Sequence, residues 1–331
     1  MVFTRLLRAF GVGGPSVDTV LDEGAVLPGG VLSGRVRVVG GSSAVEIEHV
    51  TLELVAHVEA EGGDEEREGL VAFQRATVDG GFRLAEGQER EVPFTLSLPW
   101  ETPVTELHGQ GLGVVLGVRT ELAVSGAKDK GDLDPLRVGP LPLQEAVLEA
   151  FGQLGYGFVS ADLELGHING TSQSLPFYQE IELSPPPEHA HAVQEIEVTF
   201  LATPAGMEVV LEADKRGGLF SDGGDVVHRF TVAHQDADRP DWIAVVDSWV
   251  RGMVERRGQA YQGGHASYEG HPAAHHPVGH HADGHRSGPG TGAVVAGVAA
   301  GVAVGVVGGF VAAEVIDEIG DAFEGDEGEE D

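Results

Sequence analysis

The 331-residue chain contains no cysteine. Disulfide bonds, thiolate metal sites and cysteine nucleophiles are therefore excluded, and the composition fits a reducing cytoplasm. Basic residues are scarce: the chain has 20 lysines and arginines and 53 aspartates and glutamates, which gives a formal net charge of −33. This acidic excess argues against binding nucleic acid or anionic lipid through the bulk surface. We expect a cytoplasmic protein that binds no nucleic acid.

Catalytic signatures are also missing. The sequence has no G-x-S-x-G, H-E-x-x-H or Walker glycine loop, the motifs that place a serine nucleophile, zinc ligands or a phosphate cradle. The stretch "DKGDLDP" holds three aspartates but lacks the further glycine and the distant glutamate of a calcium loop. We predict a protein that is not an enzyme and has no cofactor.

Short alternating runs, separated by glycine and aspartate turns, dominate both halves of the chain. In "VEIEHVTLELVAHVEA" the apolar positions are Val50, Leu52, Leu54, Ala56 and Val58. This pattern is typical of antiparallel strands with one buried and one wet face. The stretches "VPFTLSLPWETP" and "LPFYQEIELSPPPE" also form a weak internal repeat. The sequence therefore predicts a mainly β fold with two β-sandwiches in tandem.

A polar break, "AKDKGDLDPLRVGP", separates the two β regions. It places a boundary between an N-terminal domain at 1–128 and a second domain at 129–238. Asp132 and Asp134 lie in this break, and we interpret them as candidates that tune a hinge between the domains.

Three stretches have helical periodicity. After the break, Leu143, Val147 and Phe151 recur every fourth residue. An amphipathic helix is predicted at 239–258, and its apolar face packs on its own domain or is offered to a partner. That face consists of Trp242, Val245, Val246, Trp249 and Met253. The opening stretch has a short apolar face and no signal-peptide pattern. We therefore expect a helix that packs on the domain or one that lies at a membrane surface. Its face consists of Phe3, Leu6, Leu7 and Phe10.

Long parts of the chain resemble a known family. The stretch "VDTVLDEGAVLPGGVLSGRVRVVGGSSAVEIEHVTLELV" resembles the opening of the bacterial sporulation-control (SpoOM) family, and "LPFYQEIELSP" and "LEADKRGGLFSDGGDVVHRFTV" resemble its second half. The resemblance covers roughly residues 1–240 and rests on strands and turns. It implies two arrestin-like β-sandwich domains joined by a short hinge. It also implies a regulator of sporulation and cell division that acts through protein partners, with no active-site residue.

Residues 259–291 are rich in histidine, glycine and proline and predict a disordered linker. Neutral imidazole binds Zn²⁺, Ni²⁺ or Cu²⁺, whereas the prolines among the histidines oppose a helix that would align them. A specific metal site, adventitious metal binding and pH sensing with the acidic tail all stay open. The candidate ligands are His271, His275, His276, His280 and His281.

A ladder of small residues occupies 292–313 within the last segment, 292–331, which ends in an acidic tail. On a helix the ladder would form a groove for close packing of a second helix, and its roughly 33 Å length would match a bilayer core of about 30 Å. In water each glycine costs about 1 kcal/mol of helix stability, so a helix here requires burial. Membrane association, self-association in a homo-oligomer and an unstructured linker remain as alternatives. The ladder consists of Ala293, Gly297, Gly301, Gly305, Gly309 and Ala313.

Taken together, these patterns predict a non-enzymatic regulatory or adaptor protein of sporulation or developmental control and cell division. It would act through protein partners, with membrane contact through the C-terminal segment at the inner face of the cell membrane. Two alternatives stay open: a histidine-rich metal-binding or metal-responsive protein, and a structural protein of the cell envelope.

Overall fold

Strands make up most of the computed structural model, which describes residues 13–62, 65–191, 193–213 and 227–263. The N-terminal part contains β1 (Ser16–Leu21), β2 (Val31–Val39), β3 (Val45–Gly62), β4 (Glu65–Leu84), β5 (Glu89–Ser97), β6 (Glu106–Leu107), β7 (Gln110–Gly111), β8 (Leu116–Val124) and β9 (Lys130–Pro135). The C-terminal part contains α1 (Pro142–Gln153), β10 (Gly157–Leu165), β11 (Phe177–Ser184), β12 (Ile196–Thr203), β13 (Gly206–Ala213), β14 (His228–Ala233), the 3₁₀ turn His234–Asp236 and α2 (Trp242–Gly263). The predicted mainly β fold is confirmed.

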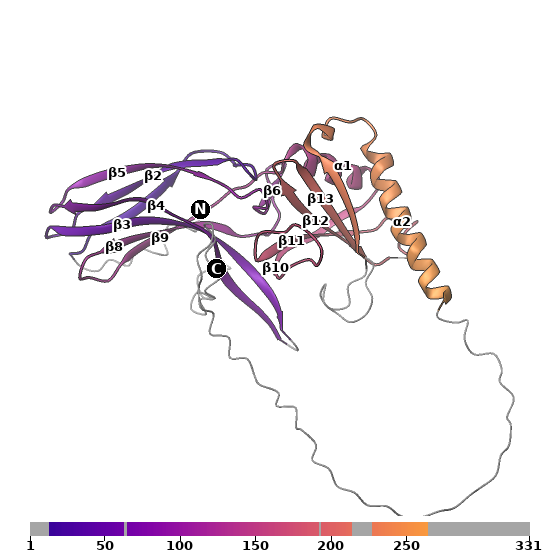
Figure 1. The fold of residues 1–331 in the computed structure, drawn as a ribbon, viewed down its shortest axis with the longest axis horizontal. Helices are drawn as coiled ribbons and strands as arrows, with labels where there is room; N and C mark the ends of the chain where they lie inside the picture. Colours follow the sequence, from indigo (N-terminus) through magenta and orange to yellow (C-terminus); the bar gives the residue numbers. More distant parts are fainter. Residues whose placement is uncertain (1–12, 63–64, 192, 214–226, 264–331) are drawn as a thin grey trace, which may run out of the picture.

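The strands form one small sheet and one long sheet (Figure 1). The small sheet has the order β1-β2-β5, and β6 and β7 form a separate hairpin. The long sheet has the order β14-β13-β12-β11-β10-β3-β8-β9, with β4 paired to the other side of β3. Below, the N-terminal sandwich means β1 to β5 with β8 and β9, and the C-terminal half means β10 to β14 with α1 and α2.

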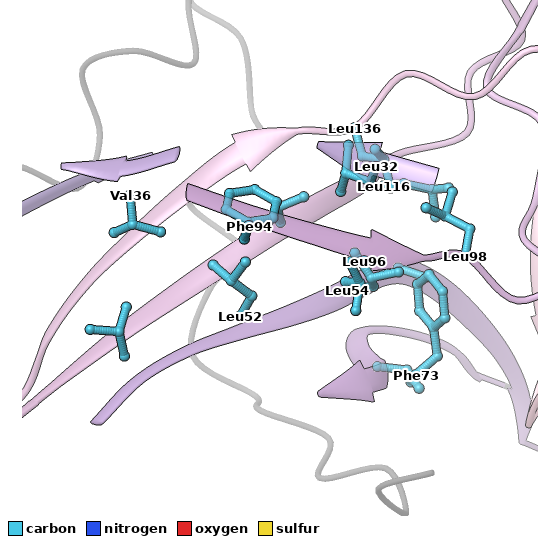
Figure 2. Packing of buried hydrophobic residues seen from close by; sticks show 14 of the residues in the cluster. Leu32, Val36, Leu52, Leu54, Phe73, Phe94, Leu96, Leu98, Leu116 and Leu136 are labelled. Atoms are coloured by element: carbon cyan, nitrogen blue, oxygen red, sulfur yellow. The ribbon is translucent and has the colours of Figure 1, made fainter. Parts of the chain in front are cut away.

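The core of the N-terminal sandwich lies between the small sheet and the β4-β3-β8-β9 part of the long sheet. Leu52 and Leu54 of β3 face Phe94 and Leu96 of β5 (Figure 2), so the predicted apolar alternation is confirmed. The expectation of a wet opposite face is wrong for the middle of β3. There Val55 is buried, and Glu53 is only 6% exposed.

Long side chains from the neighbouring strands explain why the outer face of β3 is dry. Arg119 Nε of β8 donates to Glu53 Oε2 at 2.7 Å, and Arg75 of β4 forms an ion pair with the other carboxylate oxygen at 3.3 Å. Because the paired charges satisfy each other, the strand buries a carboxylate at a position where the alternation predicts a solvated one.

The C-terminal half has one sheet, and among the described residues two helices cover its core face instead of a second sheet (Figure 1). Both predicted helices are confirmed, and each supplies an apolar stripe to one core. Helix α2 begins at Trp242 and continues to Gly263, so residues 259–263 are helical and not part of a linker. The buried residues of the stripes are Leu143, Val147, Ala150 and Phe151 of α1 and Trp242, Val246, Val250 and Met253 of α2.

No helix among the described residues is long and apolar enough to span a membrane. The predicted opening helix, the histidine-rich segment and the glycine ladder lie outside the described residues, and each stays a prediction.

Candidate functional site: the junction of the two halves

One parallel residue pair joins the sheet of the C-terminal half to the N-terminal sandwich, and the two parts together form the long sheet. Strand β10 pairs in parallel with β3 beyond the end of β8, with Glu164 opposite Glu59. The other pairs between the strands named above are antiparallel, and an isolated parallel bridge joins Val26 to Val138. The great length of β3 makes this pairing possible, because its last residues extend past β8 and offer a free edge to β10.

The two halves also share a hydrophobic core. Leu163, Leu175 and Phe177 belong in sequence to the C-terminal half, yet they pack in the core of the N-terminal sandwich. The rings of Phe73 and Phe177 meet edge to face, with centroids 5.5 Å apart. Apolar contact of this kind resists rotation of one half against the other.

Hydrogen bonds from the segment after β5 add to the junction. The Glu101 carboxylate accepts the backbone N–H groups of Ser174 at 2.8 Å and Leu175 at 2.9 Å. The Gln179 side chain accepts from the Val104 N–H at 2.9 Å and donates to the Val104 carbonyl at 2.8 Å. Hydrogen bonds to a carboxylate are stronger than those between neutral groups.

Trp100, next to Glu101, contacts both halves of the molecule. The centroid of its ring lies 5.3 Å from that of the His234 imidazole in the C-terminal half. Its indole also lies close to Gly29, which has a φ of +70° and where an added Cβ would lie 2.5 Å from the indole. Only glycine allows this approach, so the loop before β2 is shaped to fit the tryptophan.

We expect Glu101→Ala to lower the free energy of unfolding by about 1 kcal/mol, because the half-buried Leu175 N–H and the exposed Ser174 N–H both lose their acceptor. Thermal denaturation measures the loss, and amide hydrogen exchange at Ser174 and Leu175 locates it. Glu86→Gln, in an exposed turn, is the matched control. Unchanged exchange at both amides would show that the carboxylate contributes nothing to the junction.

The predicted hinge residues lie apart from this junction. Asp132 and Asp134 are on β9, which pairs with β8 in the N-terminal sandwich along six residues, with Asp132 opposite Thr120 and Asp134 opposite Val118. The boundary predicted at residue 129 therefore separates two strands that form one ladder. That the two aspartates tune a hinge stays a prediction.

Asp132 contacts the edge of the small sheet. The Thr19 N–H of β1 donates to Asp132 Oδ2 at 2.7 Å, and the hydroxyls of Thr19 and Thr120 are 2.6 Å apart. Because β1 and β9 are the last strands on this side of their sheets, these bonds close the side of the sandwich.

Asp134 keeps its proton to a higher pH than an ordinary aspartate does. Burial raises its pKa from 3.8 to about 8, and the charge of Asp132, a hydrogen bond with Asp132 and the charge of Asp18 act in the same direction. Its Oδ2 is buried and has no hydrogen-bond partner among the described residues. A proton on this pair relieves the repulsion between the two carboxylates.

A second acidic group lies on the face of the C-terminal sheet opposite the helices. Carboxylate oxygens of Asp162, Glu164 and Glu180 lie within 4.8 Å of one another, and such oxygens are the ligands of Ca²⁺ and Mg²⁺. Each of the three also takes part in other interactions. Burial, Glu180 and further carboxylates raise the pKa of Tyr178 above its ordinary value. This acidic face was not predicted from the sequence, although acidic residues at alternate positions in "SADLEL" and "FYQEIEL" indicate it.

Comparisons with known proteins agree with this architecture. The family described as SpoOM protein matches residues 3–217, more than half of the chain. The chain belongs to the SpoOM family. The sporulation-control protein Spo0M of Bacillus subtilis is 34% identical over 216 residues, which cover 65% of this chain and 81% of that protein. The crystal structure of Spo0M from Bacillus subtilis has a TM-score of 0.66 and 29% identity, and covers 74% of this chain and 100% of that one.

Membership of the SpoOM family confirms the predicted resemblance and the arrestin-like fold, and it supports a regulatory role in sporulation. The matched relatives are named as sporulation-control proteins and not as enzymes. The family match ends at residue 217, so the histidine-rich segment and the glycine ladder fall outside it.

Proposed function

We propose that this SpoOM protein is a non-enzymatic adaptor in sporulation or developmental control and cell division. The observation that carries the proposal is the junction, where the long sheet and a shared core fix the two halves relative to each other. A body of this kind holds two bound proteins at a constant separation, which is the physical task of an adaptor.

Each half exposes large apolar side chains that suit protein contact. Phe158 and Val159, neighbours on β10, are 50% and 56% exposed. On the N-terminal sandwich, Val31 at the start of β2 and Leu27 in the loop before it are 57% and 43% exposed. Exposed apolar residues that occur together mark interaction surfaces more often than single ones.

The test is rescue of spore frequency in the source organism lacking its own copy. Phe158→Glu and Val31→Glu each put a charge on one apolar pair, and we expect each to reduce rescue strongly while the full chain keeps its melting temperature. Glu86→Gln is the control for an exposed position outside both pairs. Full rescue by both glutamate variants would refute binding through these surfaces.

Membrane contact through the ladder at 292–313, self-association of that segment and metal binding by the histidines stay predictions. The adaptor proposal requires none of them, because the two apolar pairs lie entirely on described residues.

A further inference from the structure

A polar cleft opens in the C-terminal half, away from the junction. Three segments line it: Leu154 and Tyr156 follow α1, Glu188 and His189 lie in the turn after β11, and Asp247, Val250 and Arg251 belong to α2. The cleft encloses about 210 Å³. That volume suits the head of a small ligand or a single side chain.

The floor of the cleft is a preformed tyrosine–histidine pair. The Tyr156 hydroxyl and His189 Nδ1 are 2.7 Å apart, and the Tyr156 ring packs edge to face on Phe151 with centroids 5.3 Å apart. Gly155, with a φ of +88°, ends the helix and turns the chain so that Tyr156 points back beneath it. The His189 N–H donates to the Pro186 carbonyl at 2.9 Å, which fixes the turn.

The Tyr156 hydroxyl lies near two carboxylates, those of Asp247 and Glu188. Burial raises the pKa of Tyr156 above its ordinary value, and the charges of Asp247 and Glu188 raise it further. The hydroxyl therefore stays neutral, and its oxygen keeps acceptor capacity. Glu188 is exposed and lines the cleft, and no hydrogen bond or ion pair joins its carboxylate to another described residue.

Arg251 holds the place that an incoming cation would take. Its Nη2 lies 2.9 Å from Asp247 Oδ2, and its Nε donates to Asp247 Oδ1 at 3.1 Å. The Arg251 side chain is 67% exposed and that of Asp247 is 25% exposed, so the guanidinium covers the carboxylate from the solvent side. A ligand cation that binds Asp247 must displace this guanidinium, which makes Arg251 its direct competitor.

We propose that this cleft binds an alkylammonium or guanidinium group, with Asp247 and Glu188 as the charged acceptors and the Tyr156 oxygen as a neutral one. Leu154 supplies an apolar wall for the alkyl stem. A free polyamine and a lysine or arginine side chain of a partner share this chemistry. The site is independent of the adaptor role, since it lies outside the junction and both apolar pairs.

The experiment titrates the full chain with n-butylammonium, ethylguanidinium and, as the anionic counterpart, acetate. Histidine labelled with ¹³C at Cε1 reports binding by NMR, and His189→Gln assigns the His189 signal. We expect saturable shifts of that signal with both cations and none with acetate. Spermidine and a lysine-containing peptide then distinguish the two sources, because the natural class binds more tightly than n-butylammonium.

Four variants test the proposal, because each is expected to change the affinity for the cation in a stated direction. Asp247→Asn and Glu188→Gln each remove an acceptor charge, and we expect each to weaken cation binding about three- to tenfold. Tyr156→Phe keeps the ring packing and is expected to weaken binding less. Arg251→Gln removes the competing cation and is expected to tighten binding about two- to threefold.

Glu149→Gln, on the exposed side of α1, is the control that removes a charge without touching the cleft. Thermal unfolding verifies that each variant is folded. Weaker binding by Arg251→Gln, tighter binding of acetate than of the cations, or an equal effect of Glu149→Gln and Asp247→Asn would each overturn the proposal.

Discussion

Phe177→Ala is expected to lower the free energy of unfolding by about 3–5 kcal/mol. The side chain is only 1% exposed and contacts Phe73 across the junction. Its removal leaves a cavity in the core of the N-terminal sandwich, although the residue belongs to β11 of the C-terminal half. The substitution should therefore also destabilise strands that lie more than a hundred residues away in sequence.

Chemical denaturation measures this loss, and amide hydrogen exchange at Leu54 in β3 tests whether it reaches the N-terminal sandwich. Phe158→Ala is the matched control, because it removes the same side chain from the adjacent strand at a position that is 50% exposed. We expect the control to change stability by about 0.5 kcal/mol or less. Unaltered protection at Leu54 in Phe177→Ala would show that the halves unfold independently.

The second large expected effect is that the free energy of unfolding depends on pH because of Asp134. Its pKa in the folded protein is raised from 3.8 to about 8, so between these values the folded state holds a proton that the unfolded state has released. The stability that this proton supports is fully present below pH 3.8 and is lost progressively as the pH rises towards 8.

Asp134→Asn mimics the protonated acid at every pH and should escape this loss. Above pH 8 we expect the free energy of unfolding of the variant to be higher than that of the native protein by roughly 2 kcal/mol, a value that allows for the exposure of the group to solvent. This difference corresponds to about 4–8 °C in melting temperature. The difference should shrink as the pH is lowered. Asp22→Asn, in an exposed loop, is the control, and a difference that grows on acidification would contradict the assignment.

Local patterns were sufficient to predict most individual elements of this fold. The alternation of Leu52 and Leu54 predicted a buried strand face, and the fourfold spacing of Leu143, Val147 and Phe151 predicted α1. Both signals depend only on the period with which side chains point to one face. The family resemblance added the arrestin-like arrangement that periodicity alone leaves open.

The junction was not predictable from such patterns, because its contacts join residues far apart in sequence. Glu101 bonds Ser174 across 73 positions, and Asp132 bonds Thr19 across 113. The polar break around Asp132 was visible in the sequence, but its strand partner was not. The internal repeat also misled in part, since β5 belongs to the small sheet and β11 to the long one.

The shared core has a consequence for how the protein is made. Leu163, Leu175 and Phe177 complete the core that begins with β1 and β2, so the N-terminal sandwich lacks part of its interior until the ribosome has synthesised β11. Domains normally fold one after another during translation. Here a nascent chain that stalls before Phe177 lacks a side chain of the N-terminal core, so the N-terminal sandwich cannot complete its packing until that residue has been synthesised.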